Sequence, residues 1–267
     1  MEEVKVTVLM SVYNTDLKEL KEAVESILNQ TYKNFEFLII NDGAKNGEIQ
    51  LIESYKDNRI KILNNEENLG LEKSLNKGLK NAKGKYIVRM DTDDIAHLNR
   101  IEKQLEFIEE NPQYSIVVSR VNYFDERGIY GTSKSVGEIE QKDLLFGTPF
   151  THPAMIINKK DIIDAGGYPL YRRCEDYAMT LNMYSKGYKG YVMSDILLDY
   201  RLDNNNYKKK KLKDRRIESK MKWIFLGKLK VPVSKRIVYS LKPIIVGIIP
   251  TSIIKKYHEG IFKNEKN

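Results

Sequence analysis

Three aspartates fall within four positions of the segment MDTDD, residues 90–94. They follow KYIVR at 85–89, a run that predicts a strand. Alternate side chains of an extended segment share a face, so we expect Asp91 and Asp93 on one side, where two carboxylates repel and each favours a cation. A divalent ion, Mg²⁺ or Mn²⁺, accepts one or two carboxylates and takes phosphate oxygens and water as its other ligands. The cluster therefore predicts a metal and phosphate site. The alternative, capping of the next helix, accounts for only one of the three carboxylates.

A second acidic pair, Glu175 and Asp176, precedes a stretch with apolar residues at helical spacing. A carboxylate within hydrogen-bond reach of a hydroxyl can act as a general base, and Asp176 is our candidate. The alternative places both carboxylates in the first turn of a helix, where the helix dipole favours negative charge. Arg173, just before the pair, is expected to attract a phosphate or an anionic acceptor; solvated surface is an equally good account. His152 lies in an apolar surround, where a lone histidine is more often a core hydrogen-bonding residue than a catalyst.

Alternating strand and helix patterns are expected to position these groups. Strand-like runs at 4–13, 35–40, 60–63 and 85–90 alternate with helical patterns at 17–28, 46–56 and 68–82. This rhythm predicts an α/β fold with a mostly parallel sheet covered on both faces. Ligands of such sheets bind beyond the carboxyl ends of the strands. Three polar segments should therefore meet at one rim: SVYN at 11–14, NDGA at 41–44 and DTDD at 91–94.

The second half of the chain is less regular. It predicts a helix at 101–108, a strand at 115–124, a hairpin turn at 126–128, a helix at 176–186 and two short strands at 188–193 and 196–200. The single cysteine, Cys174, excludes an internal disulfide and a cysteine-built zinc site, and it fits a reducing cytoplasm. The opening MEEVKVTVLM is acidic and strand-like, so we expect no secretory signal.

Charge is distributed unevenly along the 267 residues. Residues 207–267 hold 18 Lys and Arg against 4 Asp and Glu, whereas the remainder is acidic overall. Apolar residues recur at helical spacing in this basic segment, but its longest charge-free apolar run, 243–254, has 12 residues, and a membrane span needs about 20. We therefore predict a tail that lies on an anionic membrane surface. The alternative is a helical pair packed against the body. Nucleic acid is not an expected partner, because aromatic residues are not interleaved with the charges.

Taken in order, these motifs resemble those of the family 2 glycosyltransferases, which have the GT-A fold. SVYN is similar to the end of the family's first strand, and INDGA at 40–44 resembles its D-D-G-S turn, with Asn41 and Ala44 as departures. MDTDD resembles the family's D-x-D-D motif, and CED at 174–176 resembles the E-D motif that carries the base.

Two longer segments extend the resemblance to about residues 4–202. NEENLGLEKSLNKGLKNAKGKYI at 65–87 resembles the segment that leads into the family's metal motif. FTHPAMIINKKDIIDAGGY at 150–168 is similar to a stretch common in members that assemble polysaccharides.

The resemblance implies a role for each motif. Asp42 would accept the N3–H of a uracil ring, with Tyr13 beside the base, although on the residues alone Asp42 is equally a turn residue before glycine. Asp91 would hold the ribose or the metal region, and Asp93 would hold Mn²⁺ or Mg²⁺ on the diphosphate. Asp176 would take the proton from an acceptor hydroxyl that attacks the anomeric carbon, inverting its configuration.

Further residues follow from the same resemblance. Asn14 and Asn68 are expected to bind the nucleotide-sugar. Candidate contacts to the donor sugar or the acceptor are Asp94, His152, Arg173 and Glu175. Asp203, in YRLD at 200–203, stands where many relatives have a histidine that helps bind metal or diphosphate. A carboxylate is a suitable ligand for a hard ion, so Asp203 is a candidate third metal ligand.

Together these observations predict a chain with three parts: a nucleotide-sugar-binding half at 1–97, an acceptor-binding half of the same domain at 98–206, and a membrane-associating tail at 207–267. The expected function is transfer of a hexose or N-acetylhexosamine from a UDP-sugar to a lipid-linked glycan, in capsule or lipopolysaccharide assembly on the inner face of the cell membrane. Two alternatives stay open. One is a non-catalytic adaptor that binds nucleotide-sugars at the membrane. The other is a sugar nucleotidyltransferase, although SVYNTD offers no glycine-rich phosphate loop.

Overall fold

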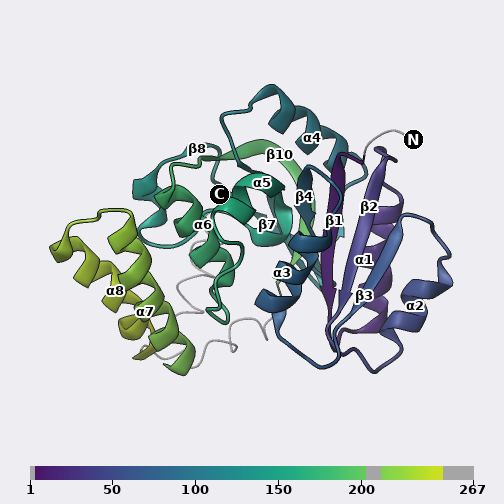
Figure 1. Ribbon diagram of the computed structural model, residues 1–267, viewed down its shortest axis with the longest axis horizontal. Helices are drawn as coiled ribbons and strands as arrows, with labels where there is room; N and C mark the ends of the chain where they lie inside the picture. The colour runs from purple at the N-terminus through teal and green to yellow at the C-terminus, as the bar shows by residue number, and fades with distance from the viewer. Residues whose placement is uncertain (1–3, 203–211, 249–267) are drawn as a thin grey trace.

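The computed structural model describes residues 4–202 and 212–248 (Figure 1). The first half of the chain forms four parallel strands in the order β3-β2-β1-β4. These strands are β1 (Val6–Val12), β2 (Phe35–Asn41), β3 (Ile60–Asn64) and β4 (Tyr86–Arg89). They are connected by α1 (Leu17–Leu28), α2 (Glu48–Ser54) and α3 (Leu71–Asn81). The predicted succession of strands and helices in this half is confirmed.

Crossover geometry decides which face each helix covers. The chain moves outward from β1 to β3 and then returns across the sheet to β4. Because right-handed crossovers are the rule, α1 and α2 lie on one face and α3 lies on the other. Close packing of α3 on β1 needs a glycine: a Cβ built on Gly78 would come within 2.2 Å of the Cδ1 atom of Leu9. The sheet is thus covered on both faces, as the apolar runs of its strands predict.

The second half extends the same sheet. Its full order is β3-β2-β1-β4-β9-β6-β10-β5, with β7 paired to β6 and β8 paired to β10. The added strands are β5 (Ile95–Ala96), β6 (Ile116–Asp125), β7 (Gly128–Thr132), β8 (Gly137–Ile139), β9 (Met155–Asn158) and β10 (Gly190–Arg201). The helical segments are α4 (Arg100–Glu110), η1 (Gln141–Leu144), η2 (His152–Ala154), α5 (Lys159–Asp164) and α6 (Glu175–Ser185). Both halves therefore share one sheet.

Two features of this half differ from the expected pattern. The segments at 188–193 and 196–200 are one strand, β10, whose register against β6 shifts between Val192 and Ile196. Such a bulge interrupts the alternation of side chains, which is why the sequence suggests two strands. Strand β9 lies antiparallel between β4 and β6. We did not predict it, because a short apolar run such as MIIN does not by its pattern distinguish a strand from a buried helix.

The basic segment forms two helices, α7 (Leu212–Lys228) and α8 (Val233–Ile248), where the structure describes it. Helix α7 packs on α6, with Met221, Phe225 and Leu226 buried. The Lys222 side chain is also fully buried, and its Nζ donates to the carbonyl oxygen of Phe146 at 3.0 Å. The alternative of a helical pair packed on the body thus holds for α7. Within the two described ranges, no helix is both long and apolar enough to cross a bilayer.

Candidate active site

Two neighbouring cavities open at the carboxyl rim of the parallel strands. The Asp42 cavity, of about 540 Å³, is lined by Asp42, Tyr13 and the loop before α3. The Asp176 cavity, of about 510 Å³, is lined by Asp91, His152 and Asp176. Leu71, Arg173 and Glu175 line both cavities. Side chains predicted from four separate motifs therefore meet here, and three of these motifs lie at the ends of adjacent parallel strands.

Asp42 organises the wall of its cavity. It is 2% exposed, and its carboxylate accepts hydrogen bonds from the side chains of Asn65 and Asn68 and from the backbone N–H groups of Leu69 and Gly70, at 2.7–3.1 Å. Four donors from the chain itself occupy the roughly four acceptor positions that a carboxylate offers. In this conformation the expected bond from a uracil N3–H to Asp42 would have to displace one of them. Asn68 lines the cavity but uses its amide to hold Asp42.

The loop after β1 places its two candidate residues differently. Tyr13 is 54% exposed and lines the Asp42 cavity, so its ring is available to a flat ligand. Asn14 has a φ of 49°, and its Oδ1 accepts from the side chain of Asn46 at 2.9 Å. It is not among the residues that line either cavity. The expected contact from Asn14 to a nucleotide-sugar stays a prediction.

The acidic segment after β4 forms a tight cluster. One carboxylate oxygen from each of Asp91, Asp93 and Asp94 lies within 4.8 Å of the others. Burial, with the charges of Asp91 and Glu19, raises the pKa of Asp93 to about 6. Burial and the charges of Asp91 and Asp93 raise the pKa of Asp94 well above its ordinary value. Crowded carboxylates with raised pKa values indicate an excess of negative charge.

This cluster fits a divalent ion. Its ligand atoms are carboxylate oxygens, which Mg²⁺ and Mn²⁺ prefer. The Oδ2 atom of Asp94 is buried and has no hydrogen-bond partner among the described residues. A buried oxygen without a donor is costly unless a cation or another group approaches it. Asp94 is fully buried and lines neither cavity, so its expected contact with a sugar stays a prediction.

Two arginines beside the cluster were missed by sequence reasoning. Arg89, 1% exposed at the end of β4, forms an ion pair with Asp91. The backbone N–H of Arg201, at the end of β10, donates to Asp94 at 2.9 Å, and its Nε donates to the carbonyl oxygen of Asp93 at 2.8 Å. The signal for Arg89 was available, since KYIVR ends in a cation two residues before Asp91. Arg201 is distant in sequence, and only the pairing of β10 with β5 brings it near.

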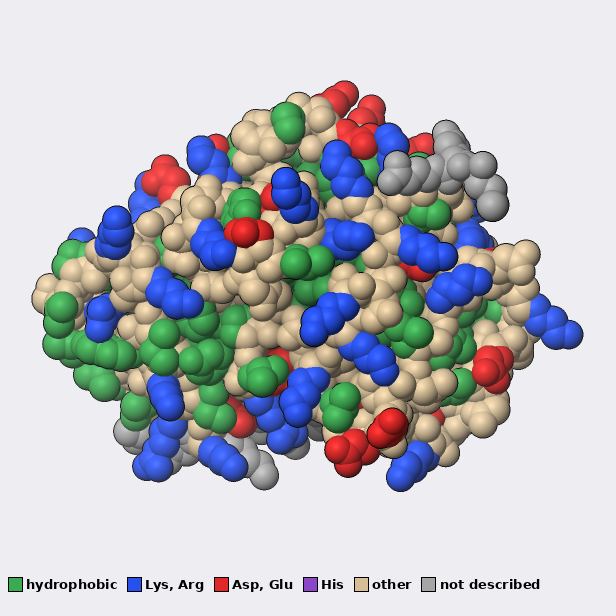
Figure 2. All heavy atoms as spheres, viewed as in Figure 1, with side chains coloured by type: hydrophobic (Ala, Val, Ile, Leu, Met, Phe, Trp, Pro, Cys, Tyr) green, Lys and Arg blue, Asp and Glu red, His purple; other side chains and the backbone are tan. Residues whose placement is uncertain are grey.

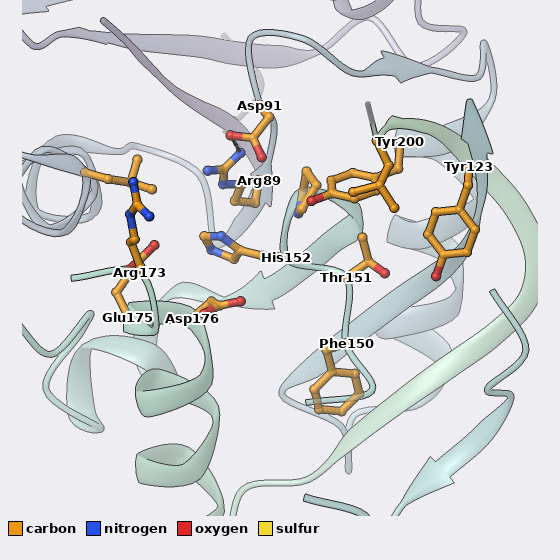
Figure 3. Close-up of a pocket in the computed structure, with 13 residues that line it drawn as sticks. Arg89, Asp91, Tyr123, Phe150, Thr151, His152, Arg173, Glu175, Asp176 and Tyr200 are labelled. Atoms are coloured by element: carbon orange, nitrogen blue, oxygen red, sulfur yellow. Dashed lines mark ion pairs between the residues drawn. The ribbon is translucent and has the colours of Figure 1, made fainter. Parts of the chain in front are cut away.

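The pair Glu175 and Asp176 begins helix α6, with both residues lining the Asp176 cavity. Figure 3 shows Asp91 and Arg89 on one side of this cavity and Glu175 and Asp176 on the other, with His152 between them. Glu175 is 8% exposed, and burial together with the charge of Asp176 raises its pKa to about 7. Glu175 and Asp176 therefore lie in the first turn of a helix, as the alternative interpretation predicts. They also line the cavity, so the two interpretations are compatible.

His152 is held by the core. Its Nε2 lies 3.0 Å from the hydroxyl oxygen of Tyr168, and burial together with the charge of Arg89 lowers its pKa well below the ordinary value. Tyr168 is in turn fixed by Asn76, whose amide bonds to its backbone N–H and carbonyl groups at 2.9 and 2.8 Å. His152 is thus a neutral hydrogen-bonding residue, as a lone histidine in an apolar surround predicts, and it also lines the Asp176 cavity.

The remaining predicted positions are Arg173 and Asp203. Arg173 lines both cavities and forms an ion pair with Asp214 of α7, with 3.1 Å between Nη1 and Oδ2. Asp203 lies outside the described residues, so its expected metal ligation stays a prediction. Apolar and aromatic residues complete the Asp176 cavity and were not singled out from the sequence, because such residues resemble core positions: Leu71, Tyr123, Phe150 and Tyr200.

Comparison with known proteins agrees with this arrangement. The EpsE protein of Bacillus subtilis (strain 168) is 32% identical over 268 residues, covering 98% of this chain and 96% of the relative. The UDP-Gal:alpha-D-GlcNAc-diphosphoundecaprenol beta-1,3-galactosyltransferase of Escherichia coli is 32% identical, covering 93% of each chain. A crystal structure of S. aureus TarS residues 1–349 with UDP-GlcNAc has a TM-score of 0.65 at 19% identity, covering 92% of this chain and 82% of that one.

A match to a family description covers the region that carries these motifs. Residues 7–173 match the family described as "Glycosyl transferase family 2". That range contains the strands of the first half except for Val6, the first residue of β1. It also contains Asp42 and the acidic cluster, and it ends just before Glu175 and Asp176. The close relatives extend over nearly the whole chain. The chain therefore belongs to glycosyl transferase family 2.

Proposed function

We propose that this protein transfers a hexose or N-acetylhexosamine from a UDP-sugar to a hydroxyl group of a lipid-linked glycan, with inversion at the anomeric carbon. The observation that carries the proposal is that Asp91, from the acidic cluster, and Asp176, a carboxylate at a helix start, line the same cavity. The Asp42 cavity opens beside it and shares three lining residues with it. A nucleotide in one cavity can therefore extend its sugar into the other.

The chemistry of the Asp42 cavity and the likeness to known proteins both support a uridine nucleotide as the donor. Tyr13 offers an exposed ring in the Asp42 cavity, where it can stack on a base. The similar Escherichia coli protein is named for UDP-Gal, and similar TarS structures contain UDP and UDP-GlcNAc. A structure with a TM-score of 0.63, the mannosyltransferase PcManGT, contains GDP-Man and Mn²⁺. The uridine nucleotide is thus the first donor class to test, and the guanosine nucleotide is the control class.

The proposed chemistry is a single displacement. Asp176 accepts the proton of the acceptor hydroxyl as its oxygen forms a bond to the anomeric carbon. The bond from that carbon to the diphosphate breaks at the same time, and the nucleoside diphosphate leaves from the opposite face. Asp91 and Asp93 would hold Mn²⁺ or Mg²⁺, which when bound offsets the negative charge that grows on the leaving diphosphate. Arg89 orients Asp91 through their ion pair.

The acceptor and the cellular site belong to the same proposal. The Escherichia coli relative is named for an acceptor on diphosphoundecaprenol, and another relative, AmsE of Erwinia amylovora, is named for amylovoran biosynthesis. Helix α8 exposes apolar side chains, and Figure 2 shows hydrophobic side chains gathered over α8 with Lys and Arg around them. Such a surface suits contact with anionic lipid. These features support our proposal that the reaction occurs on the cytoplasmic face of the cell membrane, in capsule or lipopolysaccharide assembly.

The central test replaces the carboxylates. A panel of UDP-sugars and GDP-sugars with Mn²⁺ and a GlcNAc-diphosphate-lipid acceptor should identify a donor that is turned over. Asp176→Asn should then lower kcat by about 10²- to 10⁴-fold while leaving UDP affinity within about threefold, since only the proton acceptor is lost. Asp93→Asn should abolish the Mn²⁺-dependent part of UDP binding in calorimetry. Asp164→Asn, which removes an exposed carboxylate paired with Lys186, is the control.

The outcomes separate the competing functions. Full turnover in both Asp176→Asn and Asp93→Asn contradicts the proposed mechanism. Metal-dependent UDP binding by the wild-type protein, without turnover of any donor, indicates the non-catalytic adaptor instead. Release of pyrophosphate from UTP and a sugar phosphate indicates the nucleotidyltransferase.

A further inference from the structure

Arg173 occupies the junction between the two cavities. Among the described residues, it is the one basic side chain common to the linings of both. Its φ of 65° is unusual for a residue other than glycine, and such a backbone persists where surrounding contacts hold it. Figure 3 shows its side chain beside Glu175 at the edge of the Asp176 cavity. The backbone conformation of Arg173 is therefore held by contacts with other parts of the chain, because an arginine by itself rarely adopts it.

Those contacts come from α7. The Nη1 atom of Arg173 lies 3.1 Å from the Oδ2 atom of Asp214, and the Asp214 side chain is only 15% exposed. The same loop is fixed a second time, because the ring of Tyr171 meets the ring of Phe225 edge-on at 5.7 Å. Helix α7 thus supports the loop that carries Arg173. The family match ends at residue 173, so this support comes from a part of the chain beyond it.

The other basic residues near Arg173 each line only one of the two cavities. Arg89 is 1% exposed and paired with Asp91. Lys73 and Arg172 line only the Asp42 cavity. Of the basic residues in the described part of the chain, Arg173 alone lines both cavities. A guanidinium has five N–H donors in a planar fork that suits phosphate oxygens, and the bond to Asp214 uses one of them.

We infer that Arg173, oriented by Asp214 of α7, binds the diphosphate of the nucleotide-sugar donor. This inference rests on the proposed function, since the diphosphate is the part of the donor that joins the nucleotide to the sugar. Arg173 is then a binding residue that neutralises the leaving group, and Asp214 is a positioning residue. Helix α7 then has two roles: it packs on α6, and it supports the donor site.

The first test compares ligands with and without phosphate. UDP and uridine binding are measured by calorimetry and ligand-observed NMR in the presence of Mg²⁺. Arg173→Gln should weaken UDP binding by about 10- to 100-fold, because it removes charge-assisted hydrogen bonds, and should leave uridine binding within about twofold. Arg127→Gln is the matched control, since Arg127 is paired with Asp125 in the β6–β7 hairpin and lines neither cavity.

The second test examines α7. Asp214→Asn should weaken UDP binding by about fivefold or more, and Asp214→Glu should restore most of it, with uridine binding unchanged in both. In an Arg173→Gln background, Asp214→Asn should have no further effect, because the two residues act through one contact. Glu218→Gln is the control on the same helix; Glu218 pairs with Arg215, and its side chain is as shielded as that of Asp214.

Several results would overturn the inference. Equal loss of UDP and uridine binding in Arg173→Gln indicates a general distortion of the site, and an unchanged UDP affinity shows that Arg173 does not contact the diphosphate. Additive effects of the Arg173 and Asp214 substitutions contradict the positioning role. Wild-type protein that binds no nucleoside diphosphate contradicts the proposed function itself, so the two failures are distinguishable.

Discussion

Glu175 and Asp176 are neighbours in the chain, but their surroundings give them different properties. Glu175 is buried, its pKa is raised to about 7, and its Oε2 atom has no hydrogen-bond partner among the described residues. Asp176 lines the Asp176 cavity and is the proposed base. At the scale of single residues, burial raises the pKa of Glu175, and the sequence motif E-D carries no information about burial.

This difference predicts a pH dependence. Because the pKa of Glu175 is higher in the folded state than its ordinary 4.5, the folded protein keeps a proton that the unfolded chain releases. Stability should therefore fall as pH rises from about 4.5 to about 7, by up to about 3 kcal/mol. Glu175→Gln, which is neutral throughout, should be more stable than wild type at pH 8 and nearly equal to it at pH 4. Urea unfolding at both pH values measures this, and a difference that does not change with pH would refute it.

At the scale of elements, α7 shows how a helix with a weak sequence signal becomes part of the body. Ile217, Met221 and Phe225 recur every four residues, but charged residues are spread around the rest of the helix, so the apolar stripe is narrow. Packing is achieved by Met221, Phe225 and Leu226, together with Lys222, which is buried and bonded to the carbonyl oxygen of Phe146. A lysine in the contact face hides the pattern, because a buried lysine is rare unless its ammonium group is paired.

Two adjacent residues of α7 allow a matched test of this docking. Phe225 is 4% exposed and contacts Tyr171, whereas Ile224 is 38% exposed. Phe225→Ala should lower the free energy of unfolding by about 3 to 4 kcal/mol, because it leaves a cavity between α7 and the loop before α6. Ile224→Ala should cost about 1 kcal/mol. Denaturant unfolding of both variants gives the comparison, and equal costs would show that α7 is not docked as described.

At the scale of the whole molecule, apolar exposure is concentrated at one end. On α8, the exposed residues at successive turns are Val233, Ile237, Leu241 and Ile245, with Val238 beside them. Phe146 of the body is 60% exposed and packs edge-on against Tyr239 at 4.9 Å. Residues 219–248 contain basic side chains and no Asp or Glu. An apolar face on a segment whose charged side chains are all basic complements an anionic bilayer, which supports the proposed membrane location.

Vesicle flotation tests that location. Wild-type protein should float with vesicles of phosphatidylglycerol and phosphatidylcholine, bind less at high salt, and bind weakly to phosphatidylcholine alone. Val238→Glu should reduce binding by about tenfold or more, because it removes an inserting side chain and adds a repelled charge. Ile129→Glu is the control, since Ile129 is 61% exposed on β7, away from α8. Equal binding of both variants and the wild type would contradict a membrane role for α8.

The sequence by itself determined the parallel first half of the sheet, the convergence of three strand ends and the acidic cluster. It could do so because apolar runs and turn residues act over short distances, and parallel strands bring their carboxyl ends to one edge. Only the tertiary structure decided that Asp42 is saturated by its own loop, that Asp94 is buried, and that Arg201 and Asp214 reach the site. Burial and pairing depend on which distant segments meet, and that information lies in packing and not in local pattern.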